Sequence, residues 1–216
     1  MKLSDRLLTV ASFIKEQSNV ADVGADHGLL EIYLLENEKV NSIMAIENKS
    51  GPFSILKNNL KDYDVKLSLS NGIEDIDEIV DTLVIAGMGG MLIVDILNSH
   101  KEKLANIKQI VVDAHRDNEY VRRQISNLGF YIEKEKIVYE KGTYYFVISF
   151  IKGQRDCSQL DYEWGYNIVK DPLFKQFKEH ELGVMAKNLI RYQSSEKATK
   201  KGIQERKAKM ERLENL

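Results

Sequence analysis

The stretch Val20-Ala21-Asp22-Val23-Gly24-Ala25-Asp26-His27-Gly28-Leu29-Leu30 decides the fold. Residues 20–23 form an apolar run typical of a short buried strand, and residues 29–35 begin a helical pattern. The two glycines let the backbone between these elements turn sharply and approach a ligand closely. A strand, a glycine-rich turn and a helix in this order predict the first unit of a nucleotide-binding α/β sheet.

Two carboxylates flank this turn and indicate which ligand it binds. A dinucleotide-binding turn has the pattern G-x-G-x-x-G and places a pyrophosphate at the helix N-terminus. Here the spacing is Gly24-x-x-x-Gly28, with Asp22 and Asp26 beside it. Two acids would repel a pyrophosphate, but they would attract a ligand that carries an ammonium and a sulfonium and no phosphate. S-adenosylmethionine therefore fits this turn better than a nicotinamide cofactor.

Composition and cysteine usage limit the classes of protein that remain. The 216 residues, 43% hydrophobic and 30% charged, predict one domain with a sizeable core plus an appendage. The single Cys157 cannot form an internal disulfide and indicates a reducing compartment. The four histidines are too widely spread to predict a metal site. The sequence has no signal-peptide pattern and no run of about 20 apolar residues, so we expect a cytoplasmic protein with no membrane partner.

The second strand of the expected sheet ends in an acid at an informative position. Residues 42–46 form a buried apolar run, and Glu47 follows at once. Glu47 lies about 20 residues after Gly28, the offset at which a carboxylate accepts hydrogen bonds from both ribose hydroxyls of a bound nucleoside. We therefore expect Glu47 to bind the cofactor ribose.

The next two strands also end in glycine-containing turns. Asn71 and Gly72 follow a strand at residues 65–69, where Asn71 either contacts the cofactor's adenine or only forms the turn. A strand at residues 81–86 runs into Gly87-Met88-Gly89-Gly90. A tight turn would need one glycine, so three in four positions favour close approach of the backbone to something bound.

The remaining strands predict the complete sheet. A fifth strand at residues 107–112 leads into the polar run Asp113-Ala114-His115-Arg116-Asp117. Residues 130–139 and 143–151 then form a long antiparallel hairpin. Five β/α units followed by such a hairpin are the element order of the Rossmann-like, seven-stranded class I methyltransferase sheet, so the fold class is α/β.

From residue 154 the sequence becomes highly charged with a helical pattern, which predicts a second, α-helical domain. We expect a methyltransferase domain at residues 1–153 and a helical, coiled-coil-like hairpin at residues 154–216, its helices joined near residues 194–199. The seam follows a/d spacing and consists of Leu182, Met185, Leu189 and Tyr192. This mildly basic hairpin either grips a large substrate or only packs and dimerises.

The first helix, expected at residues 3–17, carries one residue with two possible roles. Arg6 lies near its start and off its apolar stripe. It either contacts an RNA phosphate or is a solvated surface charge.

Four motifs together resemble the bacterial tRNA (adenine-22-N1) methyltransferases. They are Leu3-Ser4-Asp5-Arg6-Leu7, Ala21-Asp22-Val23-Gly24-Ala25-Asp26-His27, Glu47 with Gly51-Pro52, and Ile85-Ala86-Gly87-Met88-Gly89-Gly90. The resemblance runs over the whole chain. Two positions depart from the family pattern: Asn71 replaces a frequent acid, and Asp113-Ala114-His115 replaces a frequent Gln-Pro-Asn run.

The resemblance implies S-adenosylmethionine-dependent methylation of N1 of one adenine in tRNA. It implies tRNA as the partner. Apart from the resemblance, the spread of the histidines predicts no metal, and the sequence leaves open whether the protein is a monomer or a dimer. Asp26 is the first candidate for stabilising the charge that develops on the adenine, and His115 is the second. The expected cofactor-binding residues are Asp22, Gly24, Asp26, His27, Gly28, Glu47, Asn71, Gly72, Ala86, Gly87 and Met88.

Two other functions remain open at this point. A methyltransferase of the same fold could act on a protein or a small molecule, and would then turn over without RNA. A non-catalytic RNA-binding module could also keep the fold, although it would not need the complete set of Asp22, Gly24, Asp26 and Glu47.

Overall fold

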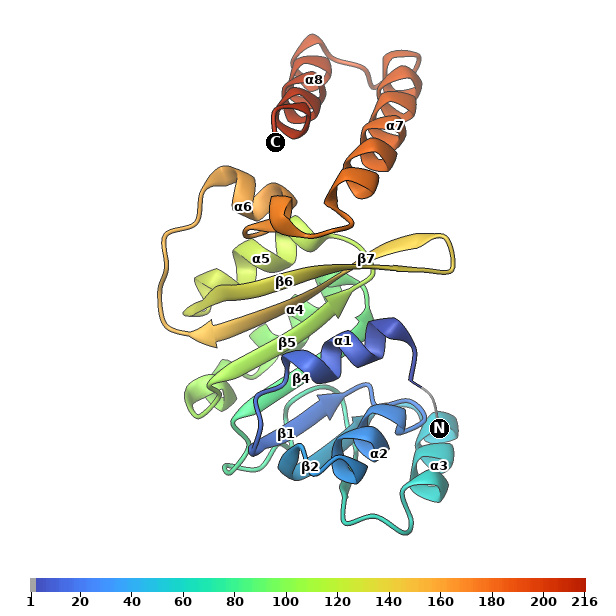
Figure 1. Cartoon of the computed structure of the whole chain (residues 1–216), viewed down its shortest axis with the longest axis vertical. Coiled ribbons are helices and arrows are strands. Elements are labelled where there is room, and N and C mark those ends of the chain that lie inside the picture. The colour runs from blue at the N-terminus through green and yellow to red at the C-terminus, as the bar shows by residue number, and fades with distance from the viewer. Residues whose placement is uncertain (1–2) are drawn as a thin grey trace.

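The computed structural model describes residues 3–216, which form a seven-stranded sheet covered by helices and two further helices that project from one end (Figure 1). The sheet order is β3-β2-β1-β4-β5-β7-β6. β7 runs antiparallel to both of its neighbours, and every other pair is parallel. The predicted methyltransferase sheet is therefore confirmed. Its strands are β1 (Ser18–Val23), β2 (Val40–Glu47), β3 (Lys66–Leu69), β4 (Thr82–Met88), β5 (Gln109–Ala114), β6 (Phe130–Glu140) and β7 (Thr143–Lys152).

Helices cover both faces of the sheet and bury separate apolar clusters. One face carries α1 (Asp5–Phe13), α2 (Leu29–Glu36) and α3 (Ser50–Asn59). The other carries α4 (Gly90–Ser99) and α5 (Asn118–Asn127), with the short 3-10 helix η1 (Lys101–Ala105) between α4 and β5. Both faces of the central strands are buried, as expected for parallel strands between two layers of helices.

Strand alternation decides which face each polar side chain meets. Ala21 and Val23 of β1 point toward the core beneath α4 and α5, and so do Val112 and Ala114 of β5. Successive strand residues point to opposite faces, so Asp22 of β1 and Asp113 of β5 point toward α1 and α2. Both acids are buried there. Asp22 meets a residue of α2, and Asp113 meets a residue of α1.

Two predicted elements differ from the structure at their ends. The first helix, expected to reach residue 17, ends at Phe13, because Ile14 is extended and the Lys15 N–H donates to Oε1 of Gln109 at 3.0 Å. It begins at Asp5, two residues later than expected, because Ser4 is extended and caps the helix: the Ser4 hydroxyl accepts from the Leu7 N–H at 3.4 Å. The fifth strand lies two residues later than its apolar run indicates, at 109–114 rather than 107–112.

The C-terminal region forms the predicted helical hairpin. It contains α6 (Gln159–Trp164), the 3-10 helix η2 (Ile168–Lys170), α7 (Phe174–Gln193) and α8 (Lys200–Glu214). We call residues 174–214 the arm and residues 3–173 the body. The predicted seam is only half-buried, and its residues Leu182 and Met185 pack against the core of the body. Trp164, Phe177 and Leu213 are part of that same core.

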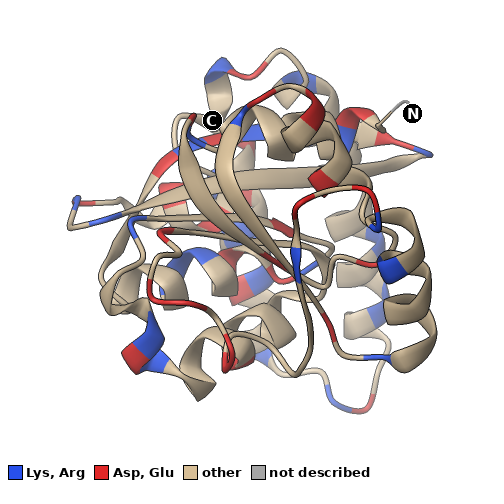
Figure 2. Ribbon diagram, turned by 90° about the horizontal axis from the view of Figure 1, so that it is seen from below, with Lys and Arg blue, Asp and Glu red and all other residues tan. Residues whose placement is uncertain are grey.

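Charge differs between the arm and the body. The arm carries 11 Lys and Arg against 6 Asp and Glu, whereas the rest of the chain carries 20 against 27. Around the body the two signs are interspersed rather than gathered on one side (Figure 2). The arm is thus the cationic part of an otherwise acidic molecule.

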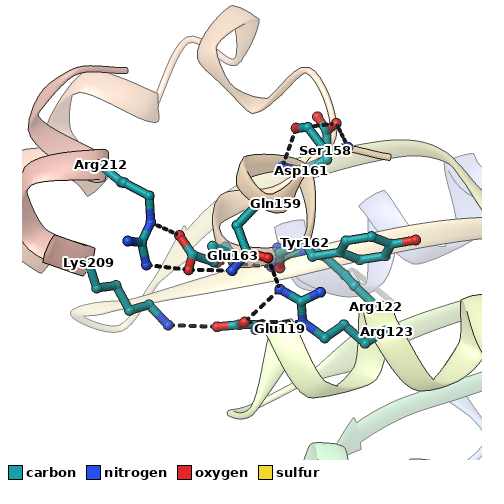
Figure 3. Close-up of polar contacts among 10 residues, drawn as sticks. All are labelled: Glu119, Arg122, Arg123, Ser158, Gln159, Asp161, Tyr162, Glu163, Lys209 and Arg212. Atoms are coloured by element: carbon teal, nitrogen blue, oxygen red, sulfur yellow. Dashed lines mark hydrogen bonds and ion pairs between the residues drawn. The ribbon is translucent and has the colours of Figure 1, made fainter. Parts of the chain in front are cut away.

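Ion pairs join α8 of the arm to the body (Figure 3). Nζ of Lys209 lies 2.6 Å from a carboxylate oxygen of Glu119 on α5. The guanidinium of Arg212 forms two hydrogen bonds with Glu163 of α6, at 2.8 and 2.6 Å. These contacts hold the arm over one end of α5 and create a cleft between arm and body.

Candidate active site

A cavity of about 650 Å³ opens at the carboxyl ends of β1, β2 and β4. It lies where the strand order reverses between β1 and β4, the usual ligand crevice of an open α/β sheet. We call it the crevice. The predicted site residues that line it are Asp22, Gly24, Asp26, His27, Glu47, Asn71, Gly72, Ala86, Gly87, Met88 and His115.

One predicted cofactor residue, Gly28, stands outside this lining. It precedes α2 with a φ of +76°, and a Cβ there would lie 3.0 Å from side-chain atoms of Leu56 and Leu60 on and after α3. The left-handed backbone and the packing against α3 both require a glycine at this position. Gly28 therefore fixes the shape of the turn from the side that packs against α3, not from the side that lines the crevice.

Gly24 has a backbone conformation that favours glycine. Its φ is +86°, and the flexible end of the Met88 side chain, at Cε, occupies the space where a Cβ would lie. Met88, at the end of β4, thus reaches across the turn that follows β1. This contact ties together the two strand ends on either side of the crevice.

Asp22 forms a buried carboxyl pair with Glu31 of α2. Glu31 is fully buried, and both of its carboxylate oxygens lack a hydrogen-bond partner among residues 3–216. Burial raises the pKa of Asp22 to about 7, an effect that its contact with Glu31 partly offsets. Burial and the neighbouring charge of Asp22 raise the pKa of Glu31 well above its ordinary value. The sequence did not single out Glu31, because a glutamate within a helix is usually solvated.

Asp26 projects from the turn into the open part of the crevice. Its φ is +50°, which Asp tolerates better than most residues do. Its side chain is 68% exposed, and one carboxylate oxygen lies 3.6 Å from Nε2 of His27. The carboxylate is therefore free to meet a bound cation.

Glu47 is held in place by the turn that follows it. Its Oε1 accepts hydrogen bonds from the backbone N–H groups of Asn48 at 3.0 Å and Lys49 at 2.9 Å. Across the same rim, Oδ1 of Asn71 accepts from the Asn48 side-chain amide at 3.3 Å. A buried, fixed carboxylate at the end of β2 is suited to bind a ribose diol.

Gly87 near the end of β4 and Gly90 at the start of α4 have different roles. A Cβ on Gly90 would lie 2.7 Å from the Arg116 carbonyl oxygen, so Gly90 is required for packing between α4 and the loop before α5. Gly87 has a φ of +80°, and a Cβ there would make no contact closer than 3.9 Å, the distance to Nη1 of Arg6 and to Nε2 of His115. Gly87 therefore leaves room for a ligand between these two side chains.

The structure shows that Arg6 is not the solvated surface charge that was one of its two predicted roles. Its side chain is 18% exposed and forms an ion pair with Asp113 at the end of β5. Its guanidinium lies over the ring of Tyr145, 5.3 Å from the centroid, and His115 contacts the same ring edge-on at 5.4 Å. Arg6 thus belongs to the wall of the crevice, and its partner lies too far along the chain for sequence spacing to indicate.

Asp113 is fully buried behind Arg6, and its Oδ1 has no partner among the residues that the structure describes. Burial raises the pKa of Asp113, and the Arg6 guanidinium partly offsets this rise. The pair presents the guanidinium N–H groups to the crevice with its charge largely neutralised.

Comparison with known proteins agrees with this geometry. The family described as "Methyltransferase domain" matches residues 3–148. The sheet order and the acidic glycine turn at the switch point define a class I, S-adenosylmethionine-dependent methyltransferase. A Streptococcus pneumoniae structure in complex with S-adenosyl-L-methionine is similar to this chain with a TM-score of 0.82 and 27% identity, covering 99% of both chains.

Two further relatives identify the family. A tRNA (adenine(22)-N(1))-methyltransferase of Bacillus subtilis (strain 168) is 32% identical over 163 residues, or 73% of this chain and 68% of that protein. The structure of M. capricolum TrmK with S-adenosyl-homocysteine is similar with a TM-score of 0.85 and 25% identity, over 100% and 97% of the two chains. The chain belongs to the tRNA (adenine(22)-N(1))-methyltransferase family.

Two further findings concern membrane spans and metal-ligand groups among the described residues. No helix in residues 3–216 is long and apolar enough to span a membrane. The same residues contain no group of three or more His, Cys, Asp or Glu side chains placed to hold a metal ion.

Proposed function

We propose that this protein transfers the methyl group of S-adenosylmethionine to N1 of adenine 22 in tRNA, with donor and acceptor meeting in the crevice. One observation carries the proposal. The acidic turn with Asp22 and Asp26, which suits a cationic methyl donor, shares one cavity with the uncrowded edge at Gly87, which can admit a base. Family membership supports the same reaction and substrate.

Different crevice residues bind different parts of the cofactor, according to their charge and shape. Asp22 and Asp26 provide carboxylates for the ammonium and sulfonium end. Glu47 accepts from the ribose hydroxyls, and Asn71 lies on the rim that meets the adenine. Met88 packs across Gly24 and supports the turn from the β4 side.

The reaction demands positioning more than proton transfer. When bound, S-adenosylmethionine would supply a methyl group on its sulfonium sulfur. The lone pair of adenine N1 would form a bond to this methyl carbon while the carbon–sulfur bond breaks, so that S-adenosylhomocysteine leaves and the base becomes a cationic 1-methyladenine. N1 carries no proton, so the crevice needs no strong general base. Alignment of N1 with the methyl group therefore accounts for most of the acceleration, and the exposed carboxylate of Asp26 stabilises the charge that develops on the base.

The acceptor side of the crevice consists of Arg6, Gly87 and His115. Arg6 offers N–H donors to the ring nitrogens of an adenine whose N1 edge faces the methyl group. His115 lies at the mouth of the crevice, where its ring can contact the inserted base. A base in folded tRNA must leave its stack to reach this position, which costs a few kcal/mol.

The cationic arm supports the binding of tRNA as a whole. Its excess of Lys and Arg, many of them exposed, provides phosphate contacts that do not depend on sequence. We propose that the protein acts on tRNA in the cytoplasm, as a monomer.

Methyl transfer from labelled S-adenosylmethionine to an unmodified tRNA transcript tests this function. The control is the same transcript with adenine 22 replaced by guanine. Label in the adenine transcript alone is the expected result. Equal label in both would mean another target base, and label in neither, with the cofactor still bound, would mean a protein or small-molecule acceptor.

A further inference from the structure

One partly buried cation in the crevice carries the wrong charge for a cationic cofactor. Among the described residues that line the crevice, four are acids and two are Lys or Arg, which are Arg6 and Lys49. Lys49 is exposed, so water and salt screen its charge. The Arg6 side chain is only 18% exposed, and its Nη1 lies near Gly87, where the target base is proposed to bind. Without a counter-charge, this guanidinium would repel a sulfonium in the same cavity.

Asp113 supplies the counter-charge from behind the wall of the crevice. Its carboxylate is fully buried and forms an ion pair with Nη1 of Arg6. Asp113 does not itself line the crevice, so it acts on a ligand there only through Arg6. A partly buried ion pair is screened much less than an exposed one, so each charge strongly offsets the other. The crevice therefore gains the hydrogen-bond donors of an arginine without its full positive charge.

The same ion pair fixes the direction of the guanidinium. Arg6 lies in the first turn of α1, and Asp113 holds its side chain at the end of β5. The guanidinium also lies over the ring of Tyr145 in β7, 5.3 Å from the centroid. A guanidinium has five N–H donors, and the pair with Asp113 uses a donor on Nη1. Further N–H donors of Arg6 can therefore meet a base that enters beside Gly87.

On these grounds we propose that Asp113 is a positioning residue, which lets Arg6 donate hydrogen bonds to the target base without repelling the cationic cofactor. If the carboxylate were removed, the Arg6 cation would weaken binding of S-adenosylmethionine. It would also oppose the positive charge that passes from the sulfur to the adenine during methyl transfer. S-adenosylhomocysteine has no sulfonium, so its affinity would change little. This inference rests on the proposed function, because it places the target base beside Arg6.

The test compares the affinities of the two forms of the cofactor. Dissociation constants for S-adenosylmethionine and S-adenosylhomocysteine are measured by calorimetry at pH 8, without tRNA. Asp113→Asn keeps the shape of the side chain and removes its charge. We expect this variant to lower the affinity for S-adenosylmethionine about fivefold relative to that for S-adenosylhomocysteine. The double variant Arg6→Gln/Asp113→Asn removes both charges, so its affinity ratio should return to within twofold of wild type.

Turnover gives a second measurement on the same variants. In Asp113→Asn, kcat for tRNA methylation should fall about tenfold while the KM for tRNA changes less than twofold. Asp77→Asn is the matched control, since it removes a carboxylate that is 39% exposed, is paired with Lys66 and lies outside the crevice. The control should keep both the affinity ratio and kcat within twofold of wild type.

The outcomes separate a charge effect from a packing effect. An unchanged affinity ratio in Asp113→Asn, or a ratio that the double variant does not restore, would overturn the proposal, because a lost packing contact weakens both forms of the cofactor alike. Arg6→Gln extends the test if Asp113→Asn does not fold: it should shift the ratio toward S-adenosylmethionine, and a shift the other way or none would also overturn it. Failure of the wild type to methylate tRNA would contradict the proposed function instead.

Discussion

The crevice and the cleft between the arm and the body are built in opposite ways. The crevice takes most of its residues from short contiguous motifs at strand ends, and the backbone of the sheet places them. The cleft depends on side-chain contacts between segments far apart in the chain, such as Lys209 with Glu119 and Arg212 with Glu163. A site that backbone geometry positions can be predicted from local sequence motifs, and it tolerates substitutions around it. A site that long-range side-chain pairs position cannot be predicted in this way.

The largest expected effect is on stability and comes from removing a buried ion pair beside the cleft. Arg122 of α5 and Glu135 of β6 form a buried ion pair at 2.9 Å, and Nη1 of Arg122 also donates to the Tyr162 carbonyl of α6 at 3.1 Å. Glu135→Ala leaves a buried cation unpaired, so the free energy of unfolding should fall by about 3–5 kcal/mol. Urea unfolding of the variant and the wild type measures this change in the free energy of unfolding. Glu119→Gln, at a half-exposed pair, is the matched control and should cost less than about 1 kcal/mol.

The second prediction concerns the chemistry of the crevice. Asp26→Asn keeps the shape of the turn and removes the carboxylate, so kcat for tRNA methylation should fall about tenfold while the melting temperature stays unchanged. Rapid-quench or steady-state assays with labelled cofactor measure the change. Activity within about twofold of wild type, or roughly 0.4 kcal/mol, would mean that Asp26 does not stabilise the transition state.

The third prediction separates the outer surface of the arm from the crevice. Lys197, Lys200, Lys201 and Lys207 are exposed, so changing all four to Gln should raise the KM for tRNA about fivefold and reduce its dependence on salt. Affinity for S-adenosylhomocysteine should not change. An unchanged KM and salt slope would show that the arm does not hold tRNA through these charges.

The smallest expected effect tests the carboxyl pair behind the crevice. An unfolded chain ionises Asp22 and Glu31 near pH 4, but burial raises the pKa of Asp22 to about 7 and that of Glu31 well above its ordinary value. The folded state thus binds more protons, so the pair's contribution to stability declines as pH rises from about 4 through about 7. Glu31→Gln should stabilise the protein by about 1 kcal/mol at pH 8, and by much less at pH 5. A pH-independent difference in urea unfolding would contradict this assignment.

Much of the fold was predictable because its signals are local. The strand at Val20–Val23, its glycine turn, and the hairpin at Lys141-Gly142 all depend on neighbouring residues, and the structure confirms them. The position of the fifth strand was wrong by two residues, because an apolar run alone does not set the register of hydrogen bonding.

The parts that sequence could not reveal depend on distant contacts. Arg6 meets Asp113 across more than a hundred residues, and Glu31 meets Asp22 through the packing of α2 on the sheet. The proposed roles of Asp26, Glu47 and His115 remain predictions, although the structure brings all three to one crevice.

Leu213 of α8 is fully buried in the same core as the strands of the body. During synthesis, the sheet therefore emerges from the ribosome long before the side chain that completes its core. The body must wait in an incompletely packed state, with Trp164 and Phe177 exposed until α8 arrives. Chaperone binding and degradation in the cell should accordingly act on nascent chains that already contain every residue of the crevice but still lack the last helix.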